Sequence, residues 1–201
     1  MSAPDSIAVA LSTLQHGATF LGQGLRTVAD GNAIEGQYQA KVIANGLREL
    51  DRFLNILADA VAAALKLPPL EQAKLSRQRN TANKLRQVHE YLGLSSPHHE
   101  RLLAIGRYRN CLFYRGGAID PGVTPQRFPI SEPAPSHESG ANGYALIADD
   151  RLVIDMHDIT DMCRFYVSLG DALVSALVAH ERLRSTAATP PASAKLRAAD
   201  Q

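Results

Sequence analysis

The residues best suited to chemistry in this chain lie between positions 107 and 117, where three arginines, an asparagine and two tyrosines precede a glycine pair. Positions three and four apart share one face of a helix, so Arg107, Asn110 and Tyr114 would form a single polar stripe. Guanidinium groups bind phosphates and carboxylates through several N–H donors. The stripe therefore indicates either an anion site or an edge that faces a partner protein.

Charge is distributed unevenly along the chain, although the formal net charge is only +1. Residues 71–115 hold nine Lys and Arg against three Asp and Glu, whereas residues 149–181 hold two against seven. The low net charge argues against a surface that coats nucleic acid generally, yet one face is expected to attract anions. Alternatively, the two segments neutralise each other within the fold.

Signals for metals and cofactors are weak. Cys111 and Cys163 are the only cysteines, too few for a disulfide framework or a structural zinc site, which fits a reducing cytoplasm. The acidic segment around His157 is explained better by Asp158 as the N-cap of the last helix than by a metal. The glycines at 22–24 lack the strand of a dinucleotide site and are expected at a close helix crossing. We expect no cofactor and no metal.

The sequence shows no targeting or membrane-spanning pattern. The first residues lack a basic stretch followed by an apolar core, and no apolar run approaches the roughly 18 residues needed to cross a bilayer. A cytoplasmic protein without membrane association is the expectation.

Two long apolar seams predict the first two helices. Apolar residues alternate steps of three and four over residues 4–30 and again over 43–65. The seams comprise Ile7, Leu11, Leu14, Ala18, Leu21, Leu25 and Val28, then Ile43, Leu47, Leu50, Leu54, Leu57, Val61 and Leu65. A turn signal at 30–32 should make the two helices antiparallel, and a proline pair ends the second.

Two shorter helices are expected next. The third covers 70–92 and is the most basic, with its Lys and Arg side chains directed outward. Ser96 and Pro97 provide an N-cap and a first helical residue for a fourth helix that runs to about Arg115. The glycine pair that follows closes this helix.

The last third of the chain combines a loop, a hairpin and a final helix. Five prolines in 117–143 predict a loop, and two short apolar runs in 144–154 predict a β-hairpin. A fifth helix over 159–184 should turn Met162, Phe165, Leu169, Leu173, Leu177 and Val178 inward, and residues 186–201 should form a disordered tail. We expect one domain over residues 1–185, an all-α, antiparallel up-down bundle of about five helices with a small hairpin.

The segment from Arg109 through Asn110 to Tyr114, on a late helix and followed by glycines, resembles the motif of the HEPN superfamily: arginine, a polar residue, three spacers, then histidine. The resemblance covers residues 4–117 loosely and the motif sharply. It implies a homodimer in which both motifs meet in one cleft, and metal-independent endoribonuclease activity of the kind found in toxin and antiviral systems. Carried over, Arg109 would hold the scissile phosphate, with Asn110 beside it.

Tyr114 stands where the family has its catalytic histidine. Cleaving RNA without a metal needs a group that exchanges protons near neutral pH, and imidazole, with a pKa near 6.5, meets this need. A phenol, with an ordinary pKa near 10, stays protonated at pH 7. The expectation is therefore a protein that binds RNA or a nucleotide, with ribonuclease activity lost or weak.

Further RNA contacts are expected from the basic third helix and from the residues beside the motif, namely Arg79, Lys84, Arg86, His89, Arg107 and Arg115. Two alternatives stay open. One is a non-enzymatic protein-interaction module whose arginines make structural ion pairs, such as Arg109 with Asp155 or Asp158. The other is an active endoribonuclease toxin with a separately encoded, antitoxin-like partner protein.

Overall fold

The computed structural model describes residues 3–26, 37–118, 146–148, 151–154 and 156–187. These residues form six α-helices and two short strands, so the prediction of a mainly helical protein is confirmed. The predicted turn at 30–32, the loop from residue 119 onward and the tail after 187 lie outside the described residues.

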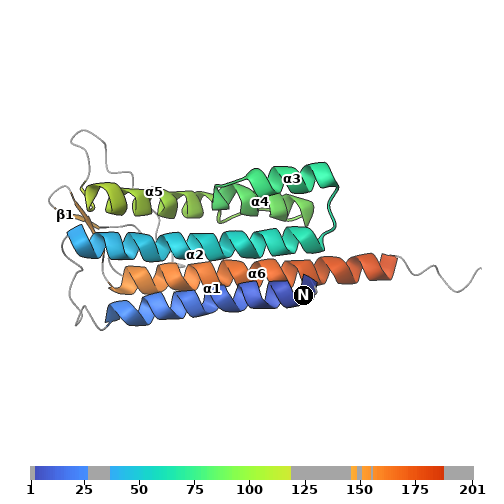
Figure 1. Cartoon of the computed structure of the whole chain (residues 1–201), viewed down its shortest axis with the longest axis horizontal. Helices are drawn as coiled ribbons and strands as arrows, with labels where there is room; N and C mark the ends of the chain where they lie inside the picture. The colour runs from blue at the N-terminus through green and yellow to red at the C-terminus, as the bar shows by residue number, and fades with distance from the viewer. Residues whose placement is uncertain (1–2, 27–36, 119–145, 149–150, 155, 188–201) are drawn as a thin grey trace, which may run out of the picture.

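The main core lies between α1 (Ala3–Arg26), α2 (Gln37–Ala64) and α6 (Met156–Ala187), which run side by side along the long axis of the molecule (Figure 1). Leu21 packs on Gly46 and Gly17 lies against Phe53, so α1 and α2 run in opposite directions. All seven residues of the second seam are buried, as are Ile7, Leu14, Ala18 and Leu21 of the first.

The close helix crossings occur at glycines other than those the sequence suggested. A Cβ atom on Gly22 or Gly24 would meet nothing within 4 Å, so the expected crossing at 22–24 is wrong. On Gly170 of α6, a Cβ atom would lie 2.7 Å from a methyl group of Leu14. Gly170 therefore lets α6 approach α1 closely enough to bury the apolar faces of both helices.

The single helix predicted over 70–92 is wrong, because the chain forms two helices there, α3 (Pro69–Arg77) and α4 (Thr81–Tyr91). Asn80 caps α4 by accepting a hydrogen bond from the backbone N–H of Asn83 at 3.0 Å. An asparagine side chain competes well for backbone donors and favours a helix start over a helix interior. The break leaves Arg79 on the short connection between the two helices.

The fourth predicted helix corresponds to α5 (His99–Arg115). Its start was predicted wrongly, since His98 is the N-cap residue and Ser96 instead contacts the His89 ring, with 3.0 Å between Oγ and Nδ1. Its end is confirmed: Gly116 adopts the left-handed conformation, with φ of 58°, and its N–H bonds to the carbonyl of Leu112. Helices α4 and α5 pack on α2, which lies between them and α1 (Figure 1).

Two three-residue strands lie within the segment where a hairpin was predicted. β1 (Leu146–Ala148) and β2 (Arg151–Val153) pair antiparallel, with Ile147 opposite Leu152. The backbone N–H of Leu152 also donates to the carbonyl of Gly117 at 2.9 Å, which ties β2 to the end of α5. The strands therefore pack against the bundle as the short length of the hairpin requires.

Helix α6 begins at Met156, earlier than predicted, so Asp158 lies in its first turn and is not its N-cap. Of the predicted inward residues, Val178 is exposed, whereas the other five are buried. By length and composition alone, Met156–Thr186 is the one helix in the described part of the chain that could cross a membrane. A helix whose apolar face is buried in a core passes the same test, and α6 has such a face.

Candidate functional site

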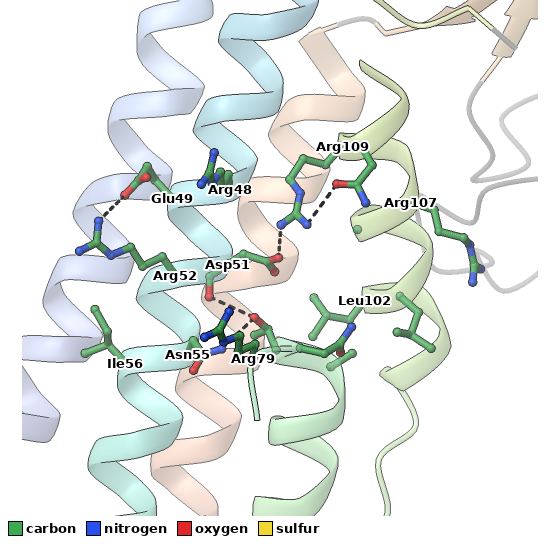
Figure 2. Close-up of a pocket in the computed structure, with 16 residues that line it drawn as sticks. Arg48, Glu49, Asp51, Arg52, Asn55, Ile56, Arg79, Leu102, Arg107 and Arg109 are labelled. Atoms are coloured by element: carbon green, nitrogen blue, oxygen red, sulfur yellow. Dashed lines mark hydrogen bonds and ion pairs between the residues drawn. The ribbon is translucent and has the colours of Figure 1, made fainter. Parts of the chain in front are cut away.

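An open cleft of about 730 Å³ lies between the middle of α2, the start of α4 and the face of α5 (Figure 2). Its lining is mostly polar and rich in arginine. The lining residues are Arg48, Glu49, Asp51, Arg52, Asn55, Ile56, Arg79, Asn80, Thr81, Ala82, Leu102, Leu103, Gly106, Arg107, Arg109 and Asn110. The cleft therefore contains two residues of the predicted motif together with groups from α2.

Asp51 forms the floor of the cleft and connects three helices. Its Oδ2 accepts a hydrogen bond from Nη1 of Arg109 on α5, and its Oδ1 accepts one from the hydroxyl of Tyr166 on α6, at 2.8 Å. The Tyr166 side chain is buried in the core. Both carboxylate oxygens are thus occupied by donors from the chain itself, and the guanidinium of Arg109 is held in one orientation.

Burial is the largest influence on the pKa of Asp51 and raises it, because the charged form loses hydration. The charge of Arg109 and the hydrogen bonds from Tyr166 and Arg109 oppose this rise. Burial and the neighbouring Asp51 carboxylate also raise the pKa of Tyr166 well above its usual value, so its hydroxyl remains a donor. The network is consistent with an ionised Arg109 oriented toward the cleft.

The positive charge of the cleft is only partly compensated. Arg109 pairs with Asp51, and Arg52 has a long contact of 3.7 Å to Glu49 on the exposed face of α2. Among the described residues, Arg48, Arg79 and Arg107 form no ion pair with any carboxylate. The cleft therefore has unpaired guanidinium groups that an incoming anion can reach.

The start of α4 is held against α2 by hydrogen bonds at the cleft wall. The Thr81 hydroxyl donates to the backbone carbonyl of Asp51 at 3.4 Å and accepts from the Asn55 side chain at 3.2 Å. These bonds fix the α3–α4 connection at the edge of the cleft. Arg79 lies on this connection, not on a helix, and lines the cleft; its contact with phosphate stays a prediction.

The two arginines of the motif do not act as a pair. Arg109 points toward α2, whereas Figure 2 shows the Arg107 side chain directed away from Asp51, on the other side of α5. Residues two apart on a helix point in nearly opposite directions, which accounts for this. Asn110 lines the cleft, and its Oδ1 accepts a long hydrogen bond of 3.4 Å from Nη2 of Arg109. Thus only Arg109 and Asn110 act together.

Tyr114 lies one helical turn beyond Asn110, and its side chain is 77% exposed. It does not line the large cleft but a smaller depression of about 180 Å³. This depression is lined by Ala44, Arg48, Arg109, Asn110, Phe113 and Tyr114. The two hollows share three residues and so form one continuous surface.

Lys84 and His89 are not available for RNA contacts, contrary to prediction. Lys84 is buried, with 3% of its side chain exposed, and its Nζ donates to both oxygens of Asp59 at 2.8 and 2.9 Å. His89 is buried against Ser96; burial lowers its pKa, and the charge of His98 lowers it further. The face of α4 that carries both residues packs on the bundle. The prediction that all basic side chains of this segment point outward was therefore wrong.

Arg86 and Arg115 are exposed but lie outside both hollows. Arg86 has a long contact of 3.8 Å to Glu90 one turn further along α4, with both side chains largely exposed. Arg115 is the last residue of α5. Neither residue contributes to the cleft. Of the predicted site residues, Arg79, Arg109 and Asn110 lie in the cleft, and Arg107 lines it with a side chain that points away from Asp51 (Figure 2).

Asp51, Tyr166 and Arg48 belong to the site but were missed in the sequence. A signal for the first was present, because Asp51 lies four residues after Leu47, on the side of α2 that faces the core. Tyr166 similarly interrupts an apolar seam with a hydroxyl that needs a partner. Arg109 binds the carboxylate of Asp51, not that of Asp158, and the other suggested partner, Asp155, lies outside the described residues.

The described residues contain no group of three or more His, Cys, Asp or Glu side chains placed to hold a metal ion. His157 is exposed and lies 3.4 Å from Asp161. A scan of protein-family models, a search of curated proteins and a search of solved structures each returned no match to this chain. The function of the cleft is therefore inferred from its own residues and from the resemblance carried by the motif.

Proposed function

We propose that this chain is a HEPN-like, antiparallel helical bundle that binds RNA or a nucleotide through its phosphate groups in the arginine-rich cleft. The observation that carries the proposal is the open cleft in which Arg48 and Arg79 have no carboxylate partner within the described residues, while Arg109 is held in place by Asp51. Unpaired guanidinium groups around a preoriented one suit phosphate groups, whose negatively charged oxygens accept hydrogen bonds from several N–H donors.

Ribonuclease activity is expected to be lost or weak. None of the described histidines lines either hollow, so no imidazole is placed to move protons beside a phosphate held at Arg109. Asp51 does not replace it, because both of its oxygens already accept hydrogen bonds. In this proposal the chain works in the cytoplasm as a homodimer, with the two clefts combined and with a possible protein partner of the antitoxin type.

The test is fluorescence anisotropy with a labelled single-stranded RNA at several KCl concentrations. Binding should weaken steeply with salt, with a slope of about −0.7 for each phosphate neutralised. Arg48→Ala and Arg79→Ala should each weaken binding and lessen the slope, because both side chains line the cleft and their loss breaks no ion pair within the described part of the chain. Arg109→Ala should weaken binding too, but it also disturbs Asp51.

Arg86→Ala is the matched control, since it removes the same charge from an exposed helix position outside the cleft. It should leave the affinity and the salt slope within error of the parent. A flat salt response, or equal effects of Arg86→Ala and Arg48→Ala, contradicts the proposal. If the RNA is cut, the chain is an active endoribonuclease, and Tyr114→Phe should then abolish the cutting.

A second candidate is a non-enzymatic protein-interaction module. The observation in its favour is that Arg109 already pairs with Asp51 of its own chain, and that Tyr166 donates a hydrogen bond to the same carboxylate, as expected for a structural arginine. In that case the protein folds and Arg48→Ala leaves it intact, but RNA binding is absent at low salt. Sedimentation of the purified protein would show whether it is a homodimer under either candidate.

A further inference from the structure

Tyr114 is an exposed aromatic side chain beside polar residues. With 77% of its surface open, it forms part of the wall of the small depression at the end of α5. A tyrosine that served the core would be buried, and Tyr108 on the same helix is buried in this way. Unlike the exposed Phe20, Tyr114 lines a depression together with arginines, so its ring is available for contacts with a ligand there.

The neighbouring ring restricts how Tyr114 can move. The rings of Phe113 and Tyr114 meet edge to face, with 5.0 Å between centroids and an interplanar angle of 79°. Phe113 itself is partly buried and packs against the core. Edge-to-face contact is a favourable arrangement for two aromatic rings, so the Tyr114 ring is supported from one side.

Two arginines line the same depression as this ring. Arg48 and Arg109 line the depression together with Tyr114, and both also line the large cleft that continues toward Arg79. A flat aromatic surface next to a track of guanidinium groups is the arrangement by which proteins bind single-stranded nucleic acid. The base stacks on the ring, and the phosphates follow the positive charges.

We propose that Tyr114 is a base-stacking residue for single-stranded RNA, with one base lying on its ring and the adjoining phosphate between Arg48 and Arg109. The inference rests on the proposed phosphate-binding function of the cleft and adds a preference for unpaired bases. It also assigns the tyrosine of the motif a binding role that depends on the ring and not on the hydroxyl. Because every base has a π face, little preference for sequence is expected.

The experiment compares three variants by anisotropy with a labelled oligouridylate. Tyr114→Ala should lower affinity by about 5- to 10-fold, at the low end of the stacking contribution seen for single bases, because the ring is open to water. Tyr114→Phe should keep the parent affinity. Neither change removes a charge, so the slope of log K against log salt should not change. Phe20→Ala, at an 80% exposed aromatic position on α1, is the control and should have no effect.

Inorganic polyphosphate is the probe that contains no base. The dissociation constant of polyphosphate, obtained by competition with the oligouridylate, should be the same for the parent and for Tyr114→Ala, because its contacts are made by arginines alone. If Tyr114→Phe loses as much affinity as Tyr114→Ala, the hydroxyl is what matters and stacking is refuted. If Tyr114→Ala weakens polyphosphate to the same degree, the ring acts through the shape of the cleft, which also overturns the inference.

The outcomes separate this inference from the function on which it rests. When Tyr114→Ala binds like the parent but Arg48→Ala binds weakly, stacking is wrong and phosphate binding stands. When neither variant changes binding and salt has no effect, both ideas fail, and a protein partner becomes the better explanation of the exposed ring. Circular dichroism of each variant establishes that it is folded.

Discussion

Replacing Asp51 with asparagine should destabilise the protein by about 3 kcal/mol. The change keeps the size of the side chain but removes the charge that faces Arg109. Breaking a buried ion pair by removing one partner ordinarily costs about 3–5 kcal/mol. The lower end is expected because 23% of the Arg109 side chain is exposed, so water can reach the orphaned guanidinium. Urea unfolding followed by circular dichroism at 222 nm measures the change.

A double-mutant cycle with Arg109→Met isolates the interaction from the side effects of each change. Since the two groups are in direct contact, the double variant should be about 1–3 kcal/mol more stable than the sum of the single effects. Glu49→Gln is the matched control, because it makes the same chemical change two residues earlier. Its contact with Arg52 is 3.7 Å long and exposed, so it should alter stability by no more than about 0.5 kcal/mol.

Two results would refute the reasoning about Asp51. One is a loss below about 1 kcal/mol for Asp51→Asn, which is what an exposed ion pair would give. The other is additivity of the Asp51 and Arg109 changes within about 0.5 kcal/mol, which would mean that the two groups do not interact in solution. In either case Asp51 does not hold the Arg109 guanidinium in place, and the proposed phosphate site loses its one preoriented arginine.

Three further predictions concern stability and reactivity. Burial lowers the pKa of His89, so the stability that the neutral ring contributes should be complete above about pH 6.5 and be lost as the pH falls through the folded-state pKa. The free energy of unfolding, measured from pH 7.5 to 5, should therefore depend less on pH in His89→Gln than in the parent. Burial raises the pKa of Cys163 to about 11, so at pH 8 this thiol should react with a chromogenic disulfide reagent only after unfolding; rapid reaction of both Cys163 and Cys111 in the native protein would contradict this. Gly170→Ala should lower the free energy of unfolding by about 1–3 kcal/mol, because its Cβ would lie 2.7 Å from a leucine methyl group of α1. Gly22→Ala, in open space, should raise the free energy of unfolding by about 0.5–1 kcal/mol. Equal effects of the two changes in chemical denaturation would show that α6 does not approach α1 so closely.

The long helices were predictable because their signal is repeated many times. Six apolar residues at regular spacing define the core face of α2, and each of them is buried. The end of α5 was predictable for a different reason: only glycine adopts the left-handed conformation at Gly116 without strain. Such signals are local, and tertiary packing did not override them.

The errors occurred where a single polar residue decides between two local structures. Asn80 ends one helix and caps the next, but its neighbours are compatible with a continuous helix over 70–92. Lys84 shows the same limit, because a lysine in a basic segment suggests an exposed position until its partner Asp59, 25 residues away, is known. The direction of a long side chain depends on such distant partners.

Only the part of the candidate site that α5 contributes was predicted in detail from the sequence. The motif on α5 gave Arg109 and Asn110, because spacing along one helix can be read from the sequence. Asp51 and Tyr166 come from two other helices, and their contact with Arg109 depends on how those helices align. A buried polar residue within an apolar seam signals that a partner exists, but it does not identify that partner.

The hydrogen bond between Leu152 and Gly117 has a consequence for how the gene can be altered. This bond places β2 next to the end of α5, so residues 119–145 connect two elements that already lie side by side. The entropy of closing a loop changes slowly with its length, by about 0.6 kcal/mol for each doubling. Shortening this connection, or inserting a reporter domain within it, should therefore leave the helices assembled and offers a route to tagged variants with an undisturbed arginine cleft.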